Sequence, residues 1–102
     1  MEEIKILGRE NGILKIALGG EIDSSNADTF YEEFTAAYAK GAADVQFDCE
    51  NLEFIDSTTL GTFVKILKTV KTDGHKMSLI RLKQKIKKLF LICSLDSIME
   101  IE

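Results

Sequence analysis

The chain has 102 residues, 45% of them hydrophobic and 29% charged, a composition typical of one globular domain spanning residues 1–102. Its net charge of −4 argues against nucleic acid as a partner, and no apolar run reaches the roughly 18 residues that a membrane-spanning helix needs. With two separated cysteines, one histidine and an acidic start without a signal-peptide core, we expect a cytoplasmic protein that inserts into no membrane and holds no metal or cofactor.

The N-terminal segment predicts two antiparallel strands. Residues 4–7 form a short apolar run, and Asn11-Gly12 is a strong signal for a two-residue hairpin turn. In residues 13–18 every second side chain is a large aliphatic one, which is the spacing of one face of a strand. Gly19-Gly20 ends this second strand, with a bend or bulge.

The next segment predicts an amphipathic helix over residues 27–38, with its aromatic stripe facing the core and Gly41 as its stop. Four polar residues before it are all suitable N-caps: Asp23, Ser24, Ser25 and Asn26. The alternation in residues 45–49 predicts a third strand, which leads through residues 52–55 to a sharp corner.

A second helix follows the corner and is closed by Asp73-Gly74. Its spacing predicts a buried stripe of Leu60, Phe63, Val64, Leu67 and Val70. The same spacing places four polar residues on the opposite side, namely Thr58, Thr62, Lys65 and Thr69. Ile66 falls on the flank, so we expect Thr62 and Ile66 near the surface.

The C-terminal third predicts a strand over residues 77–81, a helix over residues 86–93 and a short strand over residues 98–101. The fourth strand has apolar residues on both faces, which suits a strand covered on two sides. The resulting order is β-β-α-β-α-β-α-β. We therefore expect an α/β fold with a single small mixed sheet, mostly parallel, and helices packed on it.

The corner at Asp56 and Ser57 carries the main functional signal. Both residues lie where a strand ends and a helix begins, and a helix N-terminus offers unpaired N–H donors and partial positive charge. Such a position can hold a side-chain cap or a phosphate. From the residues alone, Ser57 is either a helix cap or a modifiable hydroxyl, and Asp56 is either a cap or a favourable first-turn charge.

Four segments resemble the STAS domain family. The segment F-I-D-S-T-T-L-G at residues 54–61 is similar to the family signature, and G-G-E-I-D at 19–23 is similar to its turn before the first helix. D-G-H-K-M-S-L at 73–79 and K-K-L-F at 87–90 resemble its later elements. The resemblance covers nearly the whole chain and implies the element order given above.

This resemblance implies an anti-sigma factor antagonist, a non-enzymatic protein-binding module of transcription regulation. Ser57 occupies the position that the family phosphorylates reversibly. The implied partners are an anti-sigma factor with serine kinase activity and a serine phosphatase. Thr58 and Thr59 depart from the common family form, which has a small residue or serine and then glycine. They add bulk beside the docking surface and offer rival acceptors, which puts the partner's identity in question.

We expect the partner to contact the corner through Asp23, Asp56, Thr58, Thr59, Thr62 and Ile66. A phosphate on Ser57 would place negative charge beside Asp56 and block docking. The alternative is a STAS-like subunit of a larger assembly, such as a stress-signalling complex or a lipid-transport ATPase, that acts without phosphorylation. The basic segment of residues 81–88 is either a solvated helix face or a patch for an acidic partner or lipid head group. An enzyme is disfavoured because Ser57 has no histidine near it in sequence.

Overall fold

The computed structural model describes all residues from 1 to 102 and contains one five-stranded sheet in the order β1-β2-β3-β4-β5. The elements in chain order are β1 (Ile4–Glu10), β2 (Ile13–Ile22), α1 (Ala27–Tyr38), β3 (Asp44–Ile55), α2 (Ser57–Thr72), β4 (Met77–Ile80), α3 (Gln84–Ile92), the 3-10 helix η1 (Leu95–Ser97) and β5 (Glu100–Ile101). β1 is antiparallel to β2, and the other neighbouring pairs are parallel. The predicted α/β fold with a mostly parallel sheet is confirmed.

The hairpin between β1 and β2 forms at the predicted turn. Asn11 and Gly12 have φ angles of 54° and 77°, the two left-handed conformations that a two-residue type I′ turn requires. β1 extends to Glu10, three residues beyond its predicted end, and its register against β2 shifts between Ile6 and Gly8. This bulge interrupts the side-chain alternation by which the strand is detected in the sequence.

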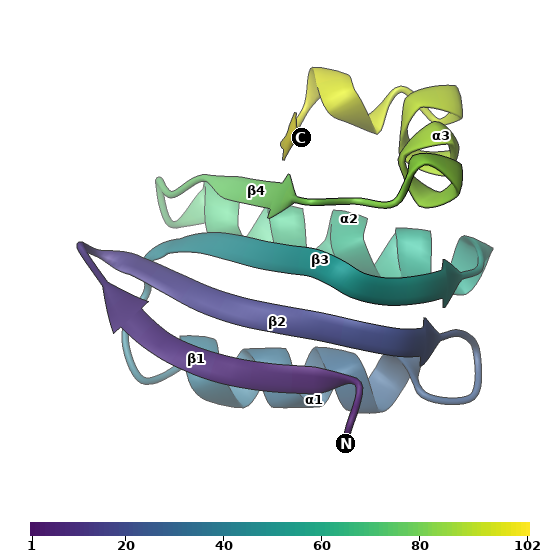
Figure 1. The fold of residues 1–102 in the computed structure, drawn as a ribbon. Helices are drawn as coiled ribbons and strands as arrows, with labels where there is room; N and C mark the ends of the chain where they lie inside the picture. Colours follow the sequence, from purple (N-terminus) through teal and green to yellow (C-terminus); the bar gives the residue numbers. More distant parts are fainter.

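The helices cover one face of the sheet. Figure 1 shows α1 and α2 side by side behind the strands, with the other face free of helices and α3 standing beyond β4, next to the end of β3. Met77 and Leu79 are therefore buried, whereas Ser78 and Ile80 on the open face are only half-buried. The prediction that β4 is covered on two sides was wrong, because α3 packs beside the end of β3 and not over the open face of β4. No helix combines the length and the apolar character needed to cross a membrane.

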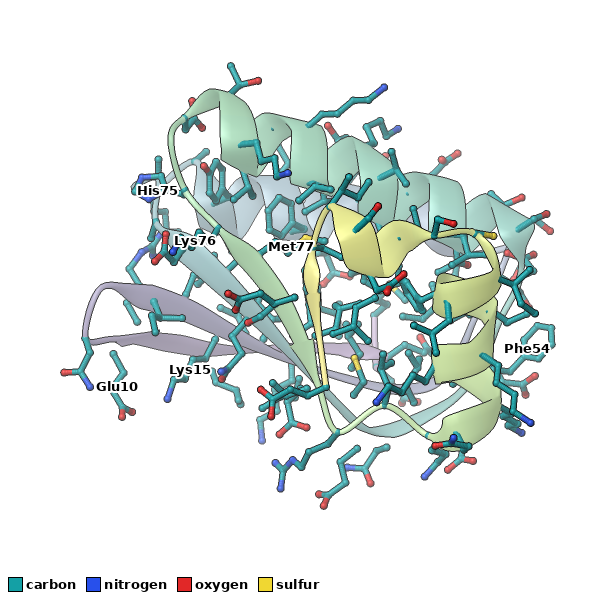
Figure 2. All side chains as sticks on the ribbon, turned by 90° about the horizontal axis from the view of Figure 1, so that it is seen from above. Glu10, Lys15, Phe54, His75, Lys76 and Met77 are labelled. Carbon is teal, nitrogen blue, oxygen red and sulfur yellow. The ribbon has the colours of Figure 1, made fainter.

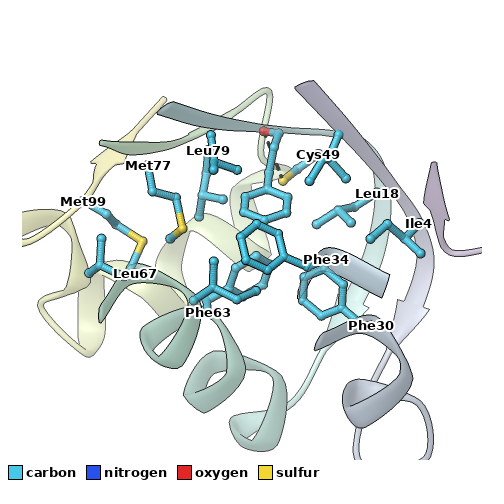
Figure 3. Close-up of a cluster of buried hydrophobic side chains, with 14 of the residues drawn as sticks. Ile4, Leu18, Phe30, Phe34, Cys49, Phe63, Leu67, Met77, Leu79 and Met99 are labelled. Atoms are coloured by element: carbon cyan, nitrogen blue, oxygen red, sulfur yellow. Dashed lines mark hydrogen bonds between the residues drawn. The ribbon is translucent and has the colours of Figure 1, made fainter. Parts of the chain in front are cut away.

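A cluster of phenylalanine rings joins the helices to the sheet within one core of 25 buried residues (Figure 3). Phe63 of α2 lies at its centre. Its ring centroid is 5.4 Å from that of Phe30 in α1, 5.5 Å from that of Phe47 in β3 and 5.5 Å from that of Phe90 in α3. These edge-to-face contacts are favourable beyond the area they bury. They fix the rotation of α2 against the sheet.

That rotation differs from the predicted one. The side chains that α2 buries are Thr59, Thr62, Phe63, Ile66, Leu67 and Val70. Leu60 and Val64 are only partly buried. The buried stripe is thus turned by roughly 70° from the predicted one, at about 100° per residue. The prediction failed because threonine was counted as polar, although its hydroxyl can bond to nearby backbone and leave its methyl group for the core.

Candidate functional site

The corner between β3 and α2 assigns different roles to Asp56 and Ser57. Asp56 is the N-cap of α2, and its Oδ1 accepts a 3.0 Å hydrogen bond from the Thr59 backbone N–H. Ser57 is the first residue of the helix, and its side chain is exposed. The capping role therefore belongs to the aspartate. The serine hydroxyl is left free at a helix N-terminus.

Two hydrogen bonds tie this corner to the turn before α1. The second carboxylate oxygen of Asp56 accepts a 2.9 Å hydrogen bond from the Ser24 backbone N–H. The Thr59 hydroxyl donates a 2.6 Å hydrogen bond to the backbone carbonyl of Ile22, at the end of β2. The turn before α1 and the corner before α2 thus form one connected surface at the same end of the sheet.

The turn of residues 23–26 is closed by its own side chains. The Asp23 carboxylate accepts a 2.9 Å hydrogen bond from the Ser25 N–H, and Asn26 Oδ1 accepts one of 2.8 Å from the Asp23 N–H. Asn26 occupies the N-cap position of α1 but makes no capping hydrogen bond with its side chain. Asp23 is half-buried beside the corner, so it shapes this surface without capping the helix.

The carboxylate of Asp56 is held in its ionised form. The hydrogen bond from the Thr59 backbone N–H is the main reason that the pKa of Asp56 lies below its usual value, and the Ser24 N–H adds to it. A negative charge therefore stands next to the Ser57 hydroxyl at neutral pH. Any further negative charge added at Ser57 would have this carboxylate as its neighbour.

Three of the predicted partner-contact residues are not on the surface. Thr59 and Ile66 have 0% of their surface exposed, and Thr62 has 7%. Thr59 is turned inward because its hydroxyl bonds to the Ile22 carbonyl, and the Thr62 hydroxyl donates to the Thr58 carbonyl one helical turn earlier. The expectation that Thr62 and Ile66 lie near the surface was wrong, as was the view of Thr59 as added bulk and a rival acceptor. Thr58 is exposed beside Ser57.

A small groove that the sequence did not reveal lies next to the corner, between the end of β3 and α3. It has a volume of about 190 Å³ and is lined by Glu53, Phe54, Ile55, Lys85, Ile86 and Leu89. Phe54 is 45% exposed because the register of β3 against β2 shifts just before it. Two wider hollows lie away from the corner. One of about 450 Å³ runs along the C-terminal half of α2, and one of about 270 Å³ lies between the start of β4 and residues 96–100.

The single histidine lies far from Ser57. His75 Nδ1 is 3.2 Å from a carboxylate oxygen of Asp44, the first residue of β3, whereas Ser57 follows the last residue of that strand. The 12-residue strand β3 therefore places His75 and Ser57 at opposite ends of the sheet. The structure therefore contains no serine–histidine pair at this corner. No group of three or more His, Cys, Asp or Glu side chains is arranged to hold a metal ion.

Comparisons with known proteins agree with the fold. The family model for the STAS domain matches residues 6–102. The anti-sigma-B factor antagonist of Bacillus subtilis (strain 168) is 32% identical over 98 residues, which cover 96% of this chain and 88% of that protein.

Solved structures show the same architecture. A crystal structure of the protein TM1081 from Thermotoga maritima matches with a TM-score of 0.85 at 25% identity, over 96% of this chain and 82% of that one. The unphosphorylated and phosphorylated forms of SpoIIAA of Bacillus match with TM-scores of 0.76 and 0.75, at 17% and 19% identity. Each form matches 97% of this chain, with 86% and 90% of the SpoIIAA chain covered. On its sequence and its fold, the chain belongs to the STAS domain family.

Proposed function

We propose that this chain is an anti-sigma factor antagonist, a protein-binding module switched by reversible phosphorylation of Ser57. The observation that carries the proposal is the exposed Ser57 hydroxyl, which is free of a capping role at the first turn of α2. The name of the Bacillus subtilis relative, an anti-sigma-B factor antagonist, supports the regulatory role. The partners are an anti-sigma factor with serine kinase activity and a serine phosphatase. We place this phosphorylation and its reversal in the cytoplasm.

The corner can carry a phosphate without rearranging. Phosphorylation adds about −1.5 to −2 charge at pH 7, and the N–H groups of a helix start favour such a charge. The core lies behind the corner and is not entered by a group on an exposed N-terminal residue. In SpoIIAA, which shares this fold, the phosphorylated and unphosphorylated structures match the chain almost equally, which is consistent with a fold that tolerates the group.

The added charge would act on docking. A like charge placed against a partner surface costs several kcal/mol, and about 4 kcal/mol weakens binding roughly 1,000-fold. We propose that the partner contacts the exposed or half-buried rim of the corner, formed by Asp23, Asp56 and Thr58 around Ser57. The buried Thr59 supports this rim from below.

Intact-mass spectrometry of the protein purified from its native cells tests the modification. We expect a population heavier by one phosphate in the wild type and in a T58A variant, and its absence in S57A. T58A is the matched control because it removes an exposed hydroxyl from the residue next to Ser57. A phosphate that persists in S57A would contradict the assignment of the site.

Binding to the purified anti-sigma factor, measured by calorimetry, tests the switch. We expect S57A to bind as the wild type does and S57D to bind at least tenfold more weakly. An S57D variant that binds as tightly as wild type would overturn the switch. A chain that is never phosphorylated and stays in a stable larger complex would instead support the alternative, a STAS subunit of an assembly.

A further inference from the structure

The outer face of α3 combines lysines with exposed aliphatic side chains. Ile86 and Phe90 point into the core, with 1% and 0% of their surface exposed. The opposite side carries Lys85, Lys88, Leu89 and Ile92, at the i, i+3, i+4 and i+7 spacing of one helical stripe. Ile92 is 79% exposed and Leu89 is 37% exposed. Such a stripe on a soluble domain is unusual enough to indicate an interaction surface.

The charge of this stripe is opposite to that of the protein. The chain carries a net charge of −4, yet residues 81–95 contain no acidic residue. Lys83 is already bound to β3. Its Nζ lies 3.5 Å from a Glu53 carboxylate oxygen and donates a 2.9 Å hydrogen bond to the Glu50 carbonyl oxygen. Lys85 and Lys88 form no such ion pair, so their charges remain available to an external acidic group.

The groove between α3 and the end of β3 continues this stripe toward the phosphorylation corner. Leu89 and Lys85 belong to both the stripe and the groove, and Phe54 forms the facing wall. Figure 2 places Phe54 beside α3, and Figure 1 shows that α3 and the end of β3 lie at the same end of the molecule. Ile55, which also lines the groove, is two residues before Ser57. The groove therefore borders the corner.

We infer that Phe54, Lys85, Lys88, Leu89 and Ile92 form a docking surface for an acidic amphipathic segment of the anti-sigma factor. An apolar side chain of that segment fills the groove against Phe54 and Leu89. Its carboxylates pair with Lys85 and Lys88. This inference rests on the proposed function and specifies the chemistry of the partner. We call these five residues the α3 docking surface.

A protein segment fits this surface better than an anionic bilayer does. The groove is concave and has the volume of a side chain, about 190 Å³, which a lipid surface would leave unfilled. An acidic partner segment also accounts for the direction of the switch, because a phosphate on Ser57 would repel it at the edge of the surface.

The test measures binding of the purified anti-sigma factor to charge-reversal and polar variants of the full chain. K85E/K88E should weaken binding at least tenfold and reduce its salt dependence, and L89S/I92S should weaken it comparably. The matched control is K68E/K71E, which makes the same charge change on exposed residues of the C-terminal half of α2 and should stay within about twofold of wild type. Both K85E and K88E leave the core side of α3 intact, and an acid at position 85 is favoured in a first helical turn.

The outcomes separate the inference from the function. If K85E/K88E binds like the control while phosphorylation of Ser57 still blocks binding, the α3 docking surface is wrong and the proposed function stands. If unphosphorylated wild type binds no anti-sigma factor, both fall. A parallel flotation assay uses vesicles of phosphatidylcholine with about 30% of the anionic lipid phosphatidylglycerol, which attracts basic surface patches. Wild-type binding to these vesicles that is lost in K85E/K88E would assign the surface to lipid and overturn the inference.

Discussion

The hydroxyl of Thr59 donates a 2.6 Å hydrogen bond to the backbone carbonyl of Ile22, a residue 37 positions earlier, and both side chains are fully buried. The same hydroxyl lies 3.0 Å from Asp56 Oδ1. Thr59 therefore connects the end of β2, the N-cap of α2 and the helix itself. A glycine at this position, as in the common family form, could make none of these side-chain contacts.

The first prediction concerns this hydroxyl. T59V keeps the shape of the side chain but leaves the buried Ile22 carbonyl without its donor, so the free energy of unfolding should fall by about 1–3 kcal/mol. T59S keeps the hydroxyl and loses one methyl group, which should cost about 0.8 kcal/mol. Urea unfolding measures both. A T59S variant that is less stable than T59V would show that packing of the methyl group, rather than the hydrogen bond, is what matters.

The second prediction separates the cap from the switch. S57A should change the free energy of unfolding by less than about 0.5 kcal/mol, because the exposed Ser57 does not cap α2. D56A should be clearly less stable than S57A, because it removes the acceptor for the Thr59 and Ser24 backbone N–H groups. Thermal unfolding of the two variants in the same buffer gives the order of their stabilities. The reverse order of stability would assign the capping role to Ser57.

The third prediction follows from the lowered pKa of Asp56. Its pKa is lowered in the folded state, chiefly by the Thr59 backbone N–H, whereas an aspartate in the unfolded chain has a pKa of about 3.9. A lowered folded-state pKa stabilises the protein above about pH 3.9, and the stabilisation is lost as the pH falls further. D56N retains a capping side chain without the charge. The stability difference between wild type and D56N should therefore be constant above about pH 5 and shrink toward pH 3.

Urea unfolding of both proteins across this pH range measures that difference. Asp44 and Asp48 also have lowered pKa values, through the Lys76 backbone N–H and the Arg81 guanidinium respectively, so both proteins lose stability in acid. Taking the difference between the two proteins removes this shared loss. A difference that grows as the pH falls would contradict the assignment.

The fourth prediction concerns the two cysteines. Cys49 is fully buried in β3, and burial raises the pKa of its thiol to about 12. Cys93 is exposed directly after α3. Because the thiolate is the reactive form, a thiol reagent such as 5,5′-dithiobis-(2-nitrobenzoate) should titrate Cys93 alone in the native protein. C93S should then react only after denaturation, and rapid reaction of native C93S would show that β3 opens locally.

The parts of the fold that the sequence predicts well are those set by local chemistry. Asn11-Gly12 specifies a hairpin turn wherever it occurs between apolar alternations, and the turn is found there. The order of elements follows from the spacing of apolar residues. The serine corner was located by its place between a strand and a helix. The sequence left the cap open between Asp56 and Ser57, and the structure assigns it to Asp56.

The failures share a different cause, which is tertiary contact. Thr59 becomes a core residue because its hydroxyl finds the Ile22 carbonyl, 37 positions earlier. Thr62 is carried into the core by the rotation of α2 against the sheet, while its hydroxyl bonds within the helix to the Thr58 carbonyl. Phe54 becomes exposed because β3 shifts register against β2 before it. No spacing within the sequence reports either event. The groove beside α3 depends on both β3 and α3 and was therefore also missed.

The two hydrogen bonds that link Asp56 to Ser24 and Thr59 to Ile22 have a kinetic consequence. They hold the corner in place from two sides, so in the proposed switch the phosphorylated and the free Ser57 hydroxyl would stand on the same backbone. With no loop to refold, no slow relaxation would separate the modification from its effect on a partner. The response time of the proposed switch would then be set by the enzymes that add and remove the phosphate, together with the lifetime of the complex that is already bound.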